Sequence, residues 1–313
     1  MDKKDKNFST INDYKKNGVF KTIIISIVFI LGLGIFSFPI ISNLIYKNAA
    51  KRVVQNFDEE VNQIEDTEIS KKLNLAYSYN EYLFGANNIN SLEDPYTQEK
   101  LSAGVEEYAK MLKINEQIGS IIIPKISIND PIYAGTSEVV LQNGIGHLEG
   151  TSLPVGGKNT HTVLTGHRGL PTAKFFTELD KLVVGDKFYI KNIGGTIAYE
   201  VDQIKIVEPT DFNDLVITPN EDYCTLLTCT PYMINSHRLL VRGHRIEYKE
   251  EVLNTEIEVS NTTNKNNKIL FASITLVIII LIYTSSKYIK KRKGLKEKIV
   301  FTEDINREKE GFD

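Results

Sequence analysis

Two long apolar segments without a charged residue constrain the fold of this chain more than any other feature. They cover residues 22–41 and 269–286, and isoleucine, leucine, valine and phenylalanine dominate them. A helix rises about 1.5 Å per residue, so about 20 apolar residues cross the roughly 30 Å hydrocarbon layer of a membrane. We therefore expect two transmembrane helices, one near each end of the chain.

Each apolar segment has an alternative interpretation that its flanking sequence argues against. A cleaved signal peptide is the alternative for the first, but the apolar part is longer than the usual ~7–15 residues and no convincing small-residue cleavage site follows it. A buried core helix is the alternative for the second, but Lys290-Lys291-Arg292-Lys293 follows it as a stop-transfer flank does. Both segments are therefore interpreted as retained spans.

The charges indicate which side of the membrane each part occupies. Basic residues lie outside both spans, at Lys15, Lys16 and Lys21 and again in the cluster 287–298, so the positive-inside rule places both termini in the cytoplasm. Residues 1–21 and 287–313 each sum to +3. Because the whole chain carries −3, the residues between them carry −9. An acidic domain outside the cytoplasm argues against nucleic acid as a partner.

The two cysteines, Cys224 and Cys229, are too far apart to form a disulfide within the chain. Five residues apart on one extended run, their Cα atoms are separated by about 16 Å, against a limit near ~7 Å for a bridge. An odd spacing also points the side chains to opposite faces of a strand. We expect Cys224 to be a small apolar core residue and Cys229 to be the reactive thiol.

The residues between the first span and position 115 are expected to be mainly helical. Apolar residues recur at intervals of three and four within 46–83, which predicts helix. This segment is either a spacer from the membrane or an extension packed against the next domain. Residues 85–95 are rich in Asn, Gly and Ser and predict a loop, and 106–113 predict a short helix.

From residue 119 onward the pattern changes to short strands. Pro124 is expected to demote part of the first strand to an edge, and Ile193-Gly194-Gly195 to form a hairpin turn. Many short strands with few helices predict a mainly β fold, a closed or nearly closed barrel. The expected strands are 121–123, 126–133, 160–166, 186–191, 196–207, 222–229 and 237–248, with short helices near 139–142 and 172–179.

Three reactive side chains stand at the ends of predicted strands. Cys229 ends one strand, because Thr230-Pro231 breaks it, and Arg238 opens the next. His167 follows a third strand in a Thr-Gly-His-Arg-Gly context. If the first two strands pair, the thiol and the guanidinium lie close together. A cysteine, a histidine and an arginine at strand ends have the composition of an acyl-transfer centre.

These motifs resemble those of the sortases. The resemblance rests on Leu227-Thr228-Cys229, on Arg238 nine residues after the cysteine, and on the context of His167. The longer motifs around these residues, Thr-Leu-Leu-Thr-Cys-Thr-Pro-Tyr and His-Arg-Leu-Leu-Val-Arg-Gly, are similar to those of class C, the pilin-polymerising branch of the family. The resemblance covers residues 74–248, and it implies an eight-stranded sortase barrel with Cys229, His167 and Arg238 as catalytic residues.

The resemblance also implies a lid over the active site. Class C sortases carry an Asp-Pro-aromatic lid, and Asp94, Pro95 and Tyr96 match it at the expected distance before the barrel. Charge-assisted hydrogen bonds would join Asp94 to Arg238, and Tyr96 would cover the sulfur of Cys229. The alternative is a loop that only packs.

The implied reaction is a transpeptidation. Cys229 would attack the Thr–Gly carbonyl of a Leu-Pro-x-Thr-Gly-like sorting signal, His167 would protonate the leaving amine, and Arg238 would hold the oxyanion. A lysine amine of another pilin would then resolve the acyl-enzyme. Pilin precursors with C-terminal sorting signals and the membrane are therefore the expected partners.

Other residues of the same types fit these roles less well. His161 begins its strand, and His237 faces away from Arg238 by strand alternation. The remaining candidates are His147 and His244, which lack a strand-end context, and Arg168 and Arg242, which are rivals of Arg238. No carboxylate is placed clearly enough to be a third catalytic member. The histidines lack zinc-ligand spacing and residues 156–158 depart from a phosphate loop, so we expect no metal and no cofactor.

Together these inferences predict a membrane-anchored enzyme whose catalytic domain lies outside the cytoplasm. Two alternatives stay open: a housekeeping sortase that attaches proteins to cell-wall amines, and a membrane-tethered binding module without catalysis. The expected parts are a tail (1–21), a transmembrane helix (22–46), a helical extension with the lid loop (47–114), the barrel (115–250), a linker (251–268), a second transmembrane helix (269–286) and a basic tail (287–313).

Overall fold

The computed structural model describes residues 3–86, 92–97 and 108–262, together with five single positions between 265 and 287. The chain divides into two units, Met1–Leu253 and Asn254–Asp313. The second unit is described mainly at residues 254–262, which are helical. The first unit contains two long helices and a β-barrel, and every site discussed below lies in it.

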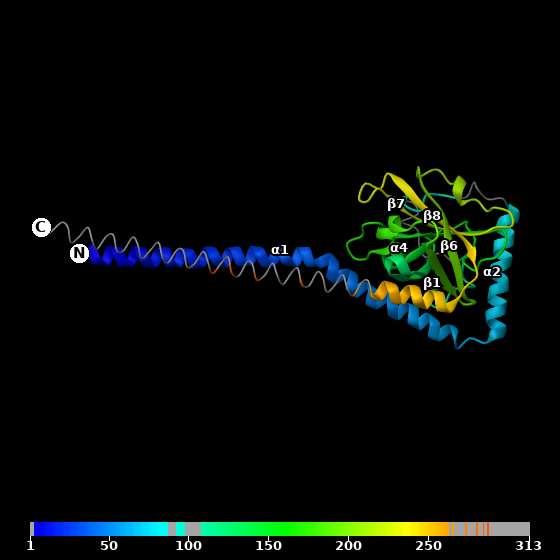
Figure 1. The fold of residues 1–313 in the computed structure, drawn as a ribbon, viewed down its shortest axis with the longest axis horizontal. Helices are drawn as coiled ribbons and strands as arrows, with labels where there is room; N and C mark the ends of the chain where they lie inside the picture. The colour runs from blue at the N-terminus through cyan, green and yellow to red at the C-terminus, as the bar shows by residue number, and fades with distance from the viewer. Residues whose placement is uncertain are drawn as a thin grey trace. The chain divides into compact units, whose positions relative to one another are not determined.

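A closed barrel of eight strands forms the body of the first unit (Figure 1). Its hydrogen-bonded order is β1-β2-β3-β4-β7-β8-β6-β5, with β5 also paired to β1. The predicted mainly β barrel is therefore confirmed. The strands are β1 (Gln117–Ile123), β2 (Ile128–Ala134), β3 (Ile145–His147), β4 (Thr160–Thr165), β5 (Lys187–Asn192), β6 (Gly195–Val207), β7 (Asp222–Thr230) and β8 (His237–Ile246).

Two long helices precede the barrel, and short helices lie in the connections between its strands. The long helix α1 (Lys3–Val61) packs its last turns on the barrel through buried Phe57 and an ion pair between Asp58 and Lys191, at 2.8 Å. In α2 (Asp66–Ala86), the buried Asn80 exchanges hydrogen bonds with the backbone of Leu153. Shorter elements are α4 (Glu138–Asn143) and the 3₁₀ helices η2 (Pro124–Ile126), η3 (Phe175–Lys181) and η4 (Asn213–Leu215).

The apolar residues of β7 serve two separate clusters, one on each face of the strand. Cys224 and Leu226 belong to the cluster that fills the barrel, with residues such as Ile121 and Tyr199. Leu227 belongs to a second cluster outside it, where Leu92 also packs. Because side chains alternate along a strand, Cys229 lies on the same face as Leu227. Both cysteines are free, as predicted.

Several predicted elements differ from the structure. The helix expected over 46–83 is broken at residues 62–65. Pro124 creates no edge strand, since the barrel is closed; it opens η2 instead, where its missing N–H is not needed. The three-residue strand β3 was not predicted. Residues 108–112 form turns, the rest of the expected helix 106–113 lying outside the described residues, and the expected linker begins as helix, at 250–262.

One helix among the described residues is long and apolar enough to cross a membrane. It is the part of α1 from Ile27 to Val61, and its apolar side chains up to Ile45 are mostly exposed. This helix contains most of the first predicted span. The second predicted span, residues 269–286, lies outside the described residues except for three single positions.

Candidate active site

The strand register brings Cys229, Arg238 and His167 to the same end of the barrel. Cys229 of β7 lies directly opposite Arg238 of β8. On its other side β7 runs parallel to β4, with Thr165 opposite Leu227, so two residues further along both chains stand His167 and Cys229. A hydrogen bond from the backbone N–H of Gly166 to Leu227, at 3.2 Å, continues this pairing past the end of β4. Three strand ends therefore hold the three side chains.

Tyr96 packs among these residues. Its ring lies 5.7 Å from the His167 ring, measured between centroids, and 5.1 Å from the Arg238 guanidinium carbon. Its hydroxyl donates to the carbonyl of Gly166, at 2.7 Å, and accepts from the Thr165 hydroxyl, at 2.9 Å. Burial raises the pKa of Tyr96, and the nearby Cys229 raises it further. Tyr96 is thus neutral, and its hydrogen bonds to Thr165 and Gly166 hold it against the end of β4, next to His167.

Asp94 binds Arg238 with both carboxylate oxygens, as the sequence predicted. The distances are 2.8 Å to Nε and 2.6 Å to Nη2, and both side chains are largely buried. Nη1 of Arg238 donates to the carbonyls of Asn235 and His237, each at 3.0 Å. All three guanidinium nitrogens are therefore engaged, two of them by the carboxylate of Asp94.

Burial keeps the thiol and the imidazole neutral in this arrangement. It raises the pKa of Cys229 to about 11, Asp94 adding to the rise while Arg238 and Arg168 oppose it. Burial also lowers the pKa of His167, against the opposing charge of Glu138. At neutral pH the covered site therefore holds a thiol beside a neutral imidazole, and a neutral thiol is a poor nucleophile.

Glu138 is a carboxylate near the site that the sequence did not single out. It begins α4, and its Oε2 lies 3.8 Å from Nε2 of His167. That distance is too long for a hydrogen bond, and Nε2 has no such partner among the described residues. Glu138 therefore acts on His167 through its charge. An acidic residue in the first turn of a helix is common, so its position next to a histidine leaves no signal in the sequence.

The two alternatives to Arg238, Arg168 and Arg242, form hydrogen bonds and ion pairs with other residues. Arg168 donates to the Thr230 hydroxyl, at 2.8 Å, and pairs with Asp180, at 2.6 Å. The second rival, Arg242, pairs with Asp202 and stacks on the Tyr223 ring. Arg168 thus lies beside the site and Arg242 outside it.

The other histidines have structural contacts. His147 is buried against Tyr108 and bonds the Ser152 carbonyl, at 2.8 Å. His161 is buried between the Val216 carbonyl and the Thr225 hydroxyl. The half-buried His237 lies 3.2 Å from Glu208, and His244 stands opposite Glu200 in the sheet. No group of three or more His, Cys, Asp or Glu in the described ranges is arranged to hold a metal ion.

A closed β-barrel that holds a cysteine, a histidine and an arginine at one end is typical of a cysteine transpeptidase. The family profile described as "Sortase domain" matches residues 121–246. The solved structure of sortase C1 from Streptococcus agalactiae is 60% identical, covering 62% of this chain and 97% of that one, with a TM-score of 0.59. The chain belongs to the sortase family, and the solved relatives described in this section are class C sortases.

Two further relatives show how far the similarity extends. Sortase C-1 from Streptococcus pneumoniae is 55% identical over 63% of this chain and 100% of that one, with a TM-score of 0.61. Sortase D of Bacillus subtilis is 29% identical over 131 residues, 41% of this chain. The matched region spans 63% of that relative's length, less than two thirds.

Proposed function

We propose that this protein is a membrane-anchored cysteine transpeptidase that polymerises pilins. The proposal is supported most directly by the position of Cys229 between His167 and Arg238, at the joined ends of β4, β7 and β8. A solved relative that is 54% identical is described as a pilus-related sortase C of Group B Streptococcus. Fold, site composition and relatives thus support the same reaction class.

The reaction proceeds in two acyl transfers. The sulfur of Cys229 attacks the Thr–Gly carbonyl of a Leu-Pro-x-Thr-Gly-like sorting signal, and its proton passes to His167. Arg238 stabilises the oxyanion of the tetrahedral intermediate. The C–N bond then breaks, His167 returns the proton to the leaving glycine amine, and a thioester remains on Cys229. A lysine amine of a second pilin attacks that thioester, which gives an isopeptide bond and the free thiol.

The lid must leave before this reaction can begin. Residues 92–97 occupy the site through Asp94 on Arg238 and Tyr96 beside Cys229. Their departure frees the guanidinium fork. It also lowers the pKa of Cys229, because both burial and the charge of Asp94 hold that pKa up. The lid therefore controls oxyanion binding and thiol reactivity together.

The membrane anchor concentrates enzyme and substrate on one surface. The span in α1 holds the protein at the membrane, with residues 1–21 in the cytoplasm and the barrel outside. A second span at 269–286 returns the chain to the cytoplasm. A pilin precursor held in the same membrane meets the enzyme at a raised effective concentration.

Product analysis separates this function from its alternatives. The full chain in detergent, carrying Tyr96→Ala to open the site, is mixed with a sorting-signal peptide, a lysine-bearing pilin and a cell-wall-type peptide amine. We expect a threonine–lysine isopeptide linkage to the pilin. Transfer only to the cell-wall amine would identify a housekeeping sortase. Peptide binding with neither product nor acyl-enzyme would identify a binding module.

A further inference from the structure

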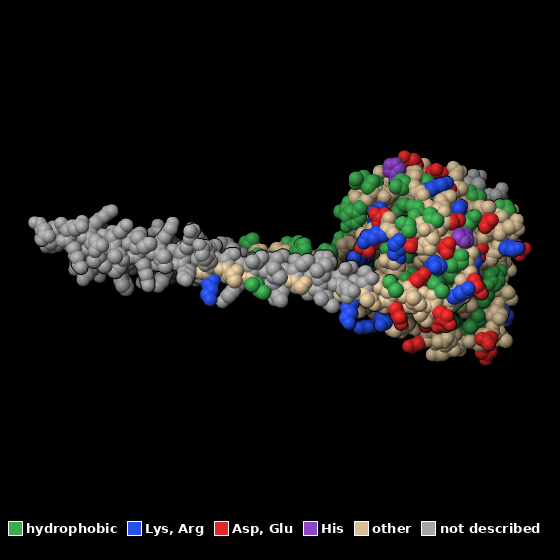
Figure 2. Space-filling model, in the orientation of Figure 1, with side chains coloured by type: hydrophobic (Ala, Val, Ile, Leu, Met, Phe, Trp, Pro, Cys, Tyr) green, Lys and Arg blue, Asp and Glu red, His purple; other side chains and the backbone are tan. Residues whose placement is uncertain are grey.

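Three consecutive apolar side chains are exposed beside the active site. Tyr232, Met233 and Ile234 in the loop between β7 and β8 are 52%, 69% and 71% exposed. The backbone N–H groups of Ile234 and Asn235 both bond the Pro231 carbonyl, at 3.1 and 3.0 Å, which holds the loop in a tight turn. Hydrophobic side chains gather over this loop at the edge of the barrel (Figure 2). Adjacent large apolar residues in water are typical of an interaction surface.

This loop is tied to the segment that carries His167. A Cβ at Gly169, whose φ is +90°, would lie 3.1 Å from Cε2 of Tyr232 and 3.3 Å from Sδ of Met233, so the two loops are in contact. The bond from Arg168 to the Thr230 hydroxyl fixes the base of the β7–β8 loop to the same segment. The two loops therefore form one surface.

The same segment is attached to α1 where that helix leaves the membrane. The backbone N–H of Lys174 donates to the Asn43 side chain, at 3.1 Å, and Phe175 packs edge-on against Tyr46, with ring centroids 4.9 Å apart. Asn43 lies three residues before the outer end of the uncharged run 22–46, or about 5 Å along the helix. Five residues link Gly169 to Lys174, which limits their separation to about 17 Å. The β7–β8 loop therefore lies close to the bilayer surface.

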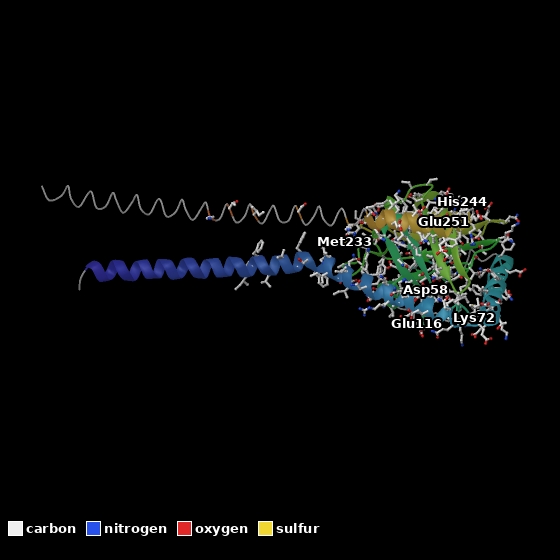
Figure 3. The ribbon with its side chains drawn as sticks, turned by 60° about the horizontal axis from the view of Figure 1, so that its bottom comes forward. Asp58, Lys72, Glu116, Met233, His244 and Glu251 are labelled. Atoms are coloured by element: carbon white, nitrogen blue, oxygen red, sulfur yellow. The ribbon has the colours of Figure 1, made fainter. Side chains whose placement is uncertain are left out.

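We propose that Tyr232, Met233 and Ile234 insert into the outer interface of the lipid bilayer in which α1 is anchored. This proposal rests on the membrane anchoring described above and not on the reaction. Tyrosine concentrates at membrane–water interfaces, and methionine and isoleucine side chains gain by leaving water there. Leu44 and Ile45, next to Asn43 on α1, are also exposed. Figure 3 places Met233 at the side of the barrel where α1 approaches it.

Bilayer contact at this loop gives the active site a fixed orientation. Cys229 ends the strand that leads into the loop, and His167 precedes Gly169 by two residues. With a span and a loop both in the interface, the barrel cannot swing freely about α1. The opening of the site then stays at the height where the sorting signal of a membrane-held precursor emerges.

A single tryptophan tests the insertion, because the chain has none of its own. The full chain with Met233→Trp is reconstituted in phosphatidylcholine–phosphatidylglycerol vesicles, and its fluorescence is recorded with and without brominated lipid. The matched control is Tyr82→Trp on α2, at a residue 68% exposed. We expect blue-shifted emission and at least twofold stronger quenching at position 233. Equal, weak quenching at both positions would overturn the proposal. The readout needs no activity, so it separates this proposal from the proposed reaction.

A paired activity assay distinguishes lipid from protein as the occupant. The double variant Met233→Ser/Ile234→Ser is compared with Leu75→Ser/Tyr82→Ser on α2, each also carrying Tyr96→Ala. With a soluble signal peptide, we expect the loop variant to be acylated at the parent rate. With a peptide anchored in the same vesicle, we expect its acylation rate to fall several-fold. An equal loss with both peptides would overturn the proposal in favour of a substrate contact. A loss confined to transfer onto a soluble pilin would overturn it in favour of a protein-docking surface.

Discussion

Asp94 binds Arg238 through both carboxylate oxygens, at 2.8 and 2.6 Å, across 144 residues of sequence. Arg238 lowers the pKa of Cys229 and the bound carboxylate of Asp94 raises it, so the contact weakens the effect of the cation on the thiol. Residues 92–97, the proposed lid, thus act on both the thiol and the guanidinium that is proposed to hold the oxyanion. This dual effect leads to separate tests for each part of the site.

Removing the tyrosine ring should activate the thiol. In Tyr96→Ala, water reaches Cys229, whose pKa falls from about 11. At that pKa about one thiol in a thousand is ionised at pH 8, so we expect alkylation by a small thiol reagent to accelerate at least tenfold. The control is Tyr82→Ala on α2. An unchanged alkylation rate in Tyr96→Ala would mean that Tyr96 does not shield Cys229 and that residues 94–96 do not act as a lid.

Replacing the guanidinium by an amine should separate thiol reactivity from acylation. Arg238→Lys keeps the charge but loses the planar fork, so in the Tyr96→Ala background acyl-enzyme formation should fall by about 100-fold. Alkylation of Cys229 should change little. The same substitution at Arg242, which pairs with Asp202 away from the site, serves as control. Near-parent acylation in Arg238→Lys would reassign the oxyanion role, with Arg168 next to be tested.

The charge of Glu138 should be visible in the titration of His167. Glu138 raises the pKa of His167 against burial, so Glu138→Gln should lower it further and move the limb of the pH–rate profile that reports this histidine to lower pH. Glu178→Gln, which removes a carboxylate paired with Lys174 and Lys181, is the matched control. NMR of the His167 ring gives the direct measurement. Identical titrations in both variants would mean that Glu138 does not act on His167.

Acid should destabilise the barrel through two buried histidines. Burial lowers the pKa of His147 and of His161 to about 4, whereas an unfolded histidine titrates near 6.5. Their contribution is complete above pH 6.5 and is lost as the pH falls toward 4, by about 3 kcal/mol each at pH 4. The buried Asp130, with a pKa raised to about 6, opposes this with the reverse sign. Burial also raises the pKa of Asp222, which adds to this opposition, and lowers the pKa of His167, which adds to the loss; we expect the two fully buried histidines to dominate.

Thermal unfolding of the full chain between pH 7 and pH 4.5 measures this loss. His161→Gln should flatten the dependence, although it lowers stability at pH 7 by removing the bond to Thr225. A chain that is as stable at pH 4.5 as at pH 7 would contradict the expected effect.

The features that could be predicted best from the sequence are the bounds of the strands and the side chains at strand ends, because both leave a local pattern. Strands β4 to β8 end within two residues of their predicted bounds, and the strand-end argument already brought Cys229 next to Arg238. The three residues of β3 are too few to show a period, and they were missed. Glu138 and the hydroxyl contacts of Tyr96 arise from tertiary packing. They follow from where α4 and the lid segment settle, which no local pattern records.

Intact-mass analysis of the acyl-enzyme tests the central claim most directly, namely that Cys229, His167 and Arg238 work in one pocket. The full chain with Tyr96→Ala is mixed with a sorting-signal peptide and quenched within seconds. We predict an adduct that ends at the signal threonine, absent in Cys229→Ala and strongly reduced in His167→Ala and Arg238→Lys. The account would be contradicted if Cys229 were alkylated freely but never acylated, or if the parent, His167→Ala and Arg238→Lys were acylated equally.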